Sequence, residues 1–364
     1  MNTLRAAVLF MALEMCVEVA LGAVSLAAAN APPVSLCSQY SGPAFVEADE
    51  SRNVIAVHAG QFPGMSFVSF DAGRVESRIA VPQRFLAASM PRNSEILTLA
   101  LAENYGVRIE SFNVVSHKQV FTRFIENLTP ELSLFARNEM LLVGVTNAGD
   151  LFKIDIKASK VVRLGGAGAG AQAIAIGGND TRLYIAGNGL AAVDIDALSV
   201  VSMLSQEKLL LGMAVSPDNS TLAVRNLHSL ELLDATSGAK LAEPIVVDAT
   251  PDAVSMSSVN IAFSPDGSQL FYAKASASES ELISLSRSPL VIERRARSSP
   301  YSSAIATVPD RNWILLTTGE PGKEQLEAFD MKTLAIIFKV GLDDTSKLDS
   351  KSKRGLCPGK SQPG

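Results

Sequence analysis

The sequence predicts an all-β protein: a seven-bladed β-propeller with four antiparallel strands in each blade. Three observations support this prediction. An apolar run, a polar turn and a second apolar run recur about every 40–45 residues, which is the length of a propeller blade. A second marker, an apolar run that ends in an acidic or polar residue before a turn, recurs in phase with the first. After residue 30, no stretch shows a sustained helical period.

The first marker is the turn residue four positions before the first buried aliphatic residue of the second run. Its clearest copies lie in "AVSPDNSTLAV" and "AFSPDGSQLFYA". In such a turn Pro presets the first position, Asp bonds its own backbone, and Gly or Asn tolerates a positive φ. These turns are expected to join the innermost strand of a blade to the second. The marker residues are Ser51, Arg92, Arg137, Asn179, Asp218, Asp266 and Asp310.

The second marker is expected to turn the chain between the third and fourth strands of each blade. Its residues are Asp71, Asn113, Asp155, Asp194, Asp234, Ser286 and Asp330. Each unit also holds four short runs rich in Val, Ile, Leu and Phe, which is typical of strands. A β-sandwich would not repeat this regularly, and a β-helix has a shorter period. The seven units therefore favour one propeller domain over residues 44–340.

The repeats resemble the YVTN-type β-propeller repeats of exported bacterial and archaeal proteins, within the broader WD40-like superfamily. The resemblance rests on "AVSPDNSTLAVRN" (214–226), "AFSPDGSQLFYAK" (262–274), "AIGGNDTRLYIAGN" (175–188) and the "D-x-x-[ST]" turns. The Gly-His and Trp-Asp pairs of true WD40 chains are missing from the sequence. The resemblance implies the fold and leaves the ligand open, because many activities share this fold.

The N-terminal segment, residues 1–29, is interpreted as a secretory signal peptide. It has one cation, Arg5, then an apolar stretch and small residues that would allow cleavage near Ala29. Glu14 and Glu18 interrupt the apolar stretch, and a retained anchor or a misplaced start are the alternatives. We therefore expect a secreted or periplasmic protein without stable membrane insertion after cleavage. Residues 30–43 form a lead-in, and residues 341–364 form a polar C-terminal tail.

Composition narrows the classes of partner. The formal net charge of −5 gives no electrostatic reason to bind nucleic acid or an anionic membrane surface. Cys37 and Cys357, at opposite ends of the mature chain, are expected to form a disulfide between the first and last blades, with two free thiols as the alternative. We expect no metal and no cofactor, because two cysteines and three scattered histidines lack ligand spacing. A monomer is expected.

The candidate binding residues lie in the loops between the second and third strands, which form one mouth of the propeller channel. They are polar, mixed in charge and rich in Asn, which suits a hydrogen-bonding surface, although Asn and Gly are also ordinary turn formers. The candidates are His58, Glu103, Asn104, Tyr105, Asn147, Asn188, Arg225, Asn226, His228, Lys274, Glu320 and Lys323.

The function expected from these residues is that of an exported, non-catalytic binding or scaffold protein. It would recognise a protein partner or a small polar ligand at the channel mouth. The first alternative is an enzyme of the lactonase or amine-dehydrogenase-subunit type, which would need His58, His228 and carboxylates to converge. The second is a structural repeat protein of the cell envelope. The basic segment "ERRARSSP" (293–300) is either a docking patch for an acidic partner or a solvated strand.

Overall fold

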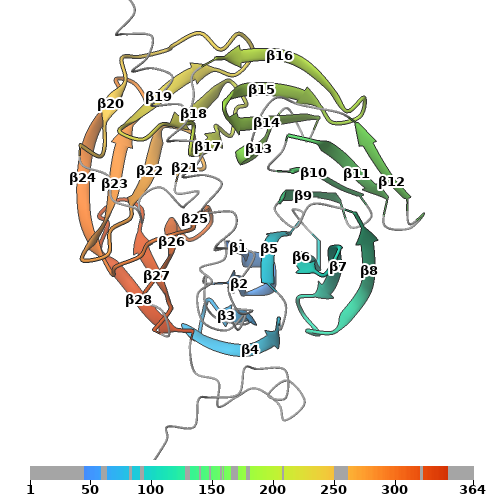
Figure 1. The fold of residues 1–364 in the computed structure, drawn as a ribbon. Coiled ribbons are helices and arrows are strands. Elements are labelled where there is room, and N and C mark those ends of the chain that lie inside the picture. Colours follow the sequence, from blue (N-terminus) through green and yellow to red (C-terminus); the bar gives the residue numbers. More distant parts are fainter. Residues whose placement is uncertain are drawn as a thin grey trace, which may run out of the picture. The chain divides into compact units, whose positions relative to one another are not determined.

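The computed structural model describes fourteen stretches of the chain, all within one compact unit, Ser41–Gly364. They are residues 45–58, 64–81, 84–90, 94–127, 132–138, 141–146, 149–155, 158, 160–164, 171–177, 181–206, 209–249, 261–319 and 323–342. Their strands form seven four-stranded antiparallel sheets, and each sheet is built from four consecutive strands. The predicted seven-bladed propeller is confirmed. Figure 1 shows the sheets following one another around a ring.

The first four blades contain strands β1 to β16. Blade 1 consists of β1 (Phe45–Asp49), β2 (Val54–His58), β3 (Gly64–Ser69) and β4 (Arg74–Ala80), with a 3-10 helix, η1 (Glu50–Arg52), after β1. Blade 2 consists of β5 (Arg84–Ser89), β6 (Ile96–Glu103), β7 (Gly106–Asn113) and β8 (Gln119–Glu126). Blade 3 consists of β9 (Leu132–Asn138), β10 (Leu141–Thr146), β11 (Leu151–Asp155) and β12 (Lys160–Leu164). Blade 4 consists of β13 (Ala171–Gly177), β14 (Arg182–Gly187), β15 (Gly189–Asp194) and β16 (Ser199–Ser205).

The last three blades contain strands β17 to β28. Blade 5 consists of β17 (Gly212–Val215), β18 (Thr221–Arg225), β19 (Ser229–Asp234) and the short β20 (Ile245–Val246). Blade 6 consists of β21 (Ile261–Phe263), β22 (Gln269–Lys274), β23 (Ser280–Ser286) and β24 (Val291–Ser298). Blade 7 consists of β25 (Ile305–Val308), β26 (Trp313–Thr318), β27 (Gln325–Asp330) and β28 (Ile336–Gly341).

The alternating strand directions divide the connections between two faces of the ring. Because neighbouring strands are antiparallel, the loops from second to third strand emerge on the same face as the connections from one blade to the next. We call this the mouth face. The other two turns of each blade emerge on the opposite face, here called the turn face. The first strand of each blade lies on the inside of the ring (Figure 1).

The hydrophobic core consists of seven clusters, and each cluster joins one pair of neighbouring blades. For example, Val57 of β2 and Leu326 of β27 belong to the cluster between blades 1 and 7. Alternation along a strand sends successive side chains to opposite faces of its sheet. Each blade therefore buries both of its faces against neighbours, and the ring is stable only when the last blade meets the first.

Ring closure is non-covalent in the described residues. Strand β1 contacts β25 and β26, and no blade shares strands with another. On the turn face, Arg311 of blade 7 forms an ion pair with Asp71 of blade 1, with 2.7 Å between Nη2 and Oδ1. The Arg311 guanidinium also lies 5.0 Å from the ring centroid of Phe70. Cys37 and Cys357 lie outside the described residues, so their disulfide stays a prediction.

The second sequence marker closes the turn between the third and fourth strands. In five blades its side-chain oxygen accepts the backbone N–H of the residue three positions later at 2.7 Å; these residues are Asn113, Asp155, Asp194, Asp234 and Asp330. In blade 1 the Ser69 hydroxyl takes this place and accepts the Ala72 N–H at 3.2 Å. The marker of the first unit is therefore Ser69, two residues before the predicted Asp71. Asp71 instead forms the ion pair to blade 7.

The first marker also has a local hydrogen-bonding role. In both SPD turns the serine hydroxyl donates to the aspartate, Ser216 to Asp218 and Ser264 to Asp266. These bonds are the largest cause of the lowered pKa of both carboxyls. Ser51, Asp218, Asp266 and Asp310 lie between the first and second strands of their blades, as predicted. Arg137 lies within β9 instead, and Arg92 and Asn179 lie outside the described residues.

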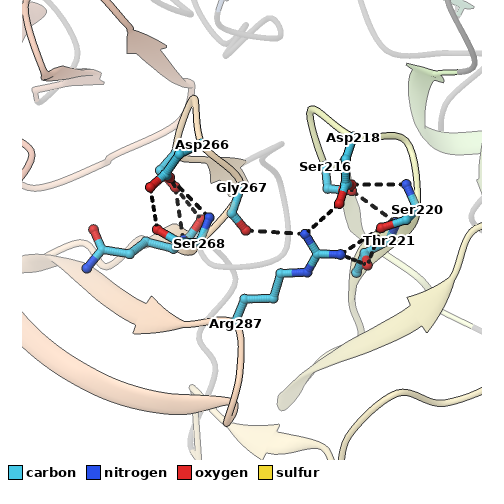
Figure 2. A network of polar contacts seen from close by, with 10 residues as sticks. Ser216, Asp218, Ser220, Thr221, Asp266, Gly267, Ser268 and Arg287 are labelled. Atoms are coloured by element: carbon cyan, nitrogen blue, oxygen red, sulfur yellow. Dashed lines mark hydrogen bonds and ion pairs between the residues drawn. The ribbon is translucent and has the colours of Figure 1, made fainter.

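The two SPD turns are joined by one arginine from the next turn on the same face. Figure 2 shows Arg287, between β23 and β24, reaching from blade 6 to blade 5. Its guanidinium donates to Asp218 at 3.1 Å, to Ser220 at 2.7 Å and to Thr221, and it also donates to the Gly267 carbonyl at 3.4 Å. The SPD turns are therefore structural, and they help hold blades 5 and 6 together.

The last turn position requires a left-handed backbone, which gives a prediction at Gly267. Gly267 has φ 71°, and the equivalent Asn219 and Asn312 have φ 58° and 54°. An added Cβ at Gly267 would meet its nearest atoms at 3.4 Å, which is ordinary contact. We expect Gly267→Asn to change the free energy of unfolding by less than about 0.5 kcal/mol. Gly267→Val should cost about 1–2 kcal/mol, because a β-branched residue resists positive φ. Urea denaturation measures both, and equal losses would contradict the assignment.

Candidate functional site

The mouth face between blades 5 and 6 carries a group of polar side chains that we call the blade 5–6 mouth cluster. It consists of Arg225 at the end of β18, His228 in the following loop, Asp248 just after β20, and Tyr272 and Lys274 at the end of β22. Second strands end on the mouth face, and the connection after β20 leaves from the same face. The fold therefore brings together residues from two loops and two blades.

Asp248 is the centre of this cluster. It is 1% exposed, and its carboxylate forms an ion pair with Lys274, with 3.4 Å between Nζ and Oδ1. Neither carboxylate oxygen makes a hydrogen bond in the part of the chain that the structure describes. A buried carboxylate is costly unless a cation and hydrogen bonds stabilise it. The position of Lys274 over this carboxylate is therefore fixed by charge.

His228 is tied to the backbone of Asp248. The Asp248 N–H donates to the His228 carbonyl at 3.1 Å, and the imidazole Nδ1 lies 3.3 Å from the Asp248 carbonyl oxygen. His228 is exposed, whereas the ammonium-bearing side chain of Lys274 is 29% exposed. Asp248 therefore contacts both side chains on the mouth face, the exposed imidazole through its backbone and the partly exposed Lys274 through its carboxylate.

Arg225 adds a second positive charge beneath this surface. It is fully buried, and its guanidinium carbon lies 5.5 Å from the ring centroid of Tyr272. Tyr272 and Lys274 are two positions apart on one strand, so their side chains share the face of β22 that borders blade 5. Among the described residues, the cluster contains two cationic side chains, Arg225 and Lys274, and one carboxylate, Asp248. Its charge favours an anionic group.

The cluster contains three of the predicted binding residues, Arg225, His228 and Lys274. A fourth, Asn226, folds the loop between them. Its Oδ1 accepts the backbone N–H groups of His228 at 3.0 Å and Ser229 at 2.8 Å. Asn226 is thus a turn former, as the simpler interpretation of these asparagines holds.

Asp248 and Tyr272 were missed by the sequence analysis. Asp248 lies in a connection between blades, whereas the predicted mouth residues come only from the loops between second and third strands. The alternation of strand directions gives a signal that could have found it, because both kinds of connection must emerge on one face. Tyr272 looks like an ordinary core residue of its strand, and nothing local to it indicates a contact with Arg225.

The other candidates lie elsewhere. His58, 3% exposed, lies between blades 1 and 2 with its ring centroid 4.0 Å from that of Phe85. Glu103 pairs with Arg108 through two hydrogen bonds. The remaining described candidates are exposed: Asn104, Tyr105, Asn188 and Lys323. Asn147 and Glu320 lie outside the described residues.

The two mouth histidines therefore lie at different blade interfaces, and the enzyme alternative loses the convergence on which it depended. The described stretches contain no group of three or more His, Cys, Asp or Glu side chains placed to hold a metal ion. His117 is a packing residue: its ring stacks on Phe67 at 4.6 Å between centroids, and its Nε2 lies 3.1 Å from the Ser77 hydroxyl oxygen. Across these stretches, no helix is long and apolar enough to cross a bilayer.

The basic segment of blade 6 forms the outer strand β24, and its arginines are paired with nearby carboxylates. Arg295 lies 2.9 Å from Glu281, and Arg297 lies 3.0 Å from Glu279. Arg294 lies 3.5 Å from its neighbour Glu293. These pairs favour a solvated edge strand over a docking patch for an acidic partner.

Comparison with known proteins places the chain by fold. No protein-family model matches it, and no curated protein matches it either. Among solved structures, hydrazine synthase from Kuenenia stuttgartiensis is similar with a TM-score of 0.62 and 13% identity over 79% of this chain and 96% of that one. The β-propeller domain of Cps50 (Swd1) from Myceliophteria thermophila has a TM-score of 0.58 and 14% identity over 79% of this chain and 98% of that domain. At these identities the similarity shows the propeller fold alone.

Proposed function

We propose that this protein is a non-catalytic binding protein and that its blade 5–6 mouth cluster takes the anionic group of a small polar ligand. The observation that carries the proposal is the buried carboxylate of Asp248, which makes no hydrogen bond within the described residues and pairs with Lys274 at 3.4 Å, while its backbone carbonyl lies 3.3 Å from Nδ1 of the exposed His228. A buried ion pair often contributes little to stability compared with apolar side chains of the same volume, so packing alone does not account for this one. A charged pair next to the fully buried Arg225 suits the recognition of a charged ligand.

The proposal includes export and a monomeric state. The apolar leader that ends near Ala29 and the two terminal cysteines support a secreted or periplasmic location. The repeats also support membership of the YVTN-type group, because the SPD turns and the D-x-x-[ST] turns that carry the resemblance lie between the strands of the blades. The ring buries both faces of each blade against its neighbours, so no blade face needs a second copy to cover it, which supports the monomer.

The expected result is that small anions bind, and that Lys274→Met weakens this binding roughly tenfold, since a charged hydrogen-bond donor is lost. Titration calorimetry with succinate, citrate and inorganic phosphate measures the dissociation constants. Lys274→Arg keeps the charge and the pair with Asp248, and it should retain binding.

The matched control is Lys118→Met, which removes an exposed lysine near the turn of blade 2 and should leave binding unchanged. The proposal fails if none of the three anions binds, or if Lys274→Met and Lys118→Met have the same effect. Binding that survives Lys274→Met would place the anion elsewhere on the molecule and would equally refute it.

A further inference from the structure

The hairpin between β6 and β7 presents an aromatic side chain to solvent. Tyr105, at its tip, is 91% exposed and has φ 68°. A bulky residue rarely adopts positive φ, and the exposure of 91% leaves the Tyr105 ring accessible to another molecule. Tyrosine is also enriched among the residues that carry binding energy at protein interfaces.

The tip is held rigidly. The Arg108 guanidinium donates two hydrogen bonds to the Glu103 carboxylate, one of them at 2.8 Å, across the base of the turn. The Asn127 N–H donates to the Tyr105 carbonyl at 2.8 Å. A Cβ added at Gly106 would collide with the Ile125 carbonyl oxygen, so the tip packs closely on β8. A rigid tip lowers the entropy cost of binding through Tyr105.

A groove of about 330 Å³ lies between the outer strands of blades 2 and 3. Its apolar residues include Ile125 of β8, Ile154 of β11 and Val161 of β12, which belong to the core cluster between the two blades. Glu126 links the two features, because it lines the groove and pairs with Gly106 in the sheet.

The charges that face the groove are positive. Arg123 shares the face of β8 that carries Ile125, and Arg163 shares the face of β12 that carries Val161, so alternation turns both arginines toward the shared interface. Arg163 donates to the Glu126 carbonyl at 3.1 Å. Among the described residues, no carboxylate pairs with either arginine. Glu126 and Asp155 also border the groove, but alternation places them on the opposite faces of their strands.

The open edge of β8 completes the surface. In its sheet, β8 pairs with β7 alone, and the Arg163 contact shows that the Glu126 carbonyl can accept a donor from outside the sheet. An extended segment can add to such an edge through main-chain hydrogen bonds, while side-chain pockets give the specificity. A small ligand would use neither this edge nor the exposed Tyr105.

The geometry points to a protein-docking surface formed by Tyr105, the groove and the edge of β8, which receives an extended segment of a partner protein with an acidic residue next to apolar ones. The acidic residue lies against Arg123 and Arg163, and an apolar neighbour fills the groove. Tyr105 packs on the partner beside the groove. This surface lies on blades 2 and 3, and it is independent of the anion site on blades 5 and 6.

The test uses the full chain and fluorescence anisotropy with a labelled Leu-Glu-Val-Glu-Leu peptide, compared with Leu-Lys-Val-Lys-Leu. The acidic peptide should bind more tightly than the basic one. Arg123→Gln should weaken its binding roughly fivefold or more, and so should Tyr105→Asn, which keeps a residue that tolerates positive φ. Neither change should lower the melting temperature, because the Arg123 side chain is exposed and makes no hydrogen bond or ion pair within the described residues, and the Tyr105 side chain is exposed.

Two controls separate this surface from other effects. Arg297→Gln removes an arginine that is 85% exposed on another blade and should leave peptide binding unchanged. Lys274→Met should also leave it unchanged, so a failure here is distinguishable from a failure of the anion site. The proposal is overturned if both peptides bind equally, or if Arg123→Gln behaves like Arg297→Gln. Binding of octanoate in the groove without any binding of the acidic peptide would also overturn it, in favour of a small amphipathic ligand.

Discussion

Replacing Arg225 with alanine is expected to lower the free energy of unfolding by about 3–5 kcal/mol. Arg225 is among the largest fully buried side chains of the described residues. It packs between blades 5 and 6 over the Tyr272 ring. Alanine leaves a cavity at this interface and removes the guanidinium that lies over the Tyr272 ring. Urea denaturation of the variant and the parent protein measures the loss.

A second variant separates the packing part of this loss of unfolding free energy from the electrostatic part, and a third serves as the control. Arg225→Met keeps most of the side-chain volume and removes the charge, so its loss measures the electrostatic part. Arg297→Ala removes an arginine that is 85% exposed and should change stability by less than about 0.5 kcal/mol. If Arg225→Ala costs no more than Arg297→Ala, the buried cation has no structural role at this interface.

The stability of the protein is expected to fall by about 3 kcal/mol between pH 6.5 and pH 4 because of His58. Burial lowers the pKa of His58 to about 4, and the hydrogen bond from its Nδ1 to the Gly64 carbonyl at 2.8 Å offsets this only in part. Its Nε2 has no hydrogen-bond partner in the described residues. The folded protein therefore keeps the neutral imidazole.

The direction of the pH dependence follows from the protonation state of His58 in the folded and in the unfolded chain. Above pH 6.5 the histidine is neutral in both the folded and the unfolded chain, and stability does not depend on it. Between pH 6.5 and about 4 the unfolded chain binds a proton and the folded chain does not, so acid favours unfolding. Below about pH 4 both are protonated and the dependence ends. The lowered carboxyl pKa values of Asp218 and Asp266 act below this window.

The measurement is urea denaturation at several pH values from 7.5 to 4 for the parent protein and for His58→Gln. The variant should lose most of the slope between pH 6.5 and 4. His117 is the necessary comparison, because burial also lowers its pKa and it acts with the same sign. Both histidines lie between blades 1 and 2. An unchanged slope in His58→Gln, with a loss of slope in His117→Gln instead, would assign the pH dependence to His117 and contradict the prediction.

The fold was predictable because its signals are local. Each turn residue accepts hydrogen bonds from groups only a few positions away. The Asp234 carboxylate accepts the Ser237 N–H, and the Asp266 carboxylate accepts the Ser268 N–H. A pattern of such turns separated by apolar runs defines strands and their order along the chain. The second marker is displaced in blade 1, to Ser69 in place of Asp71, because two polar residues in one turn could each fill the role, and the hydrogen bond decides between them.

The candidate site was predictable only in part. Loop position alone identified Arg225, His228 and Lys274, since the ends of second strands must share a face. It could not rank them above Asn188 or Asn104, which are exposed, nor reveal that Asn226 shapes a turn. What distinguishes the cluster is the burial of Asp248 against Lys274, and burial depends on the neighbouring blade.

The sequence by itself determined the number of blades, the strand order and the chemistry of the turns, because these depend on periodic patterns and on contacts within a few residues. Only the tertiary structure decided which polar side chains meet across the blade interfaces. Asp248 meets Lys274, Arg287 meets Asp218, and Arg311 meets Asp71 at the closure of the ring. Such contacts join residues that are far apart in the chain, and they form only when whole blades pack side by side.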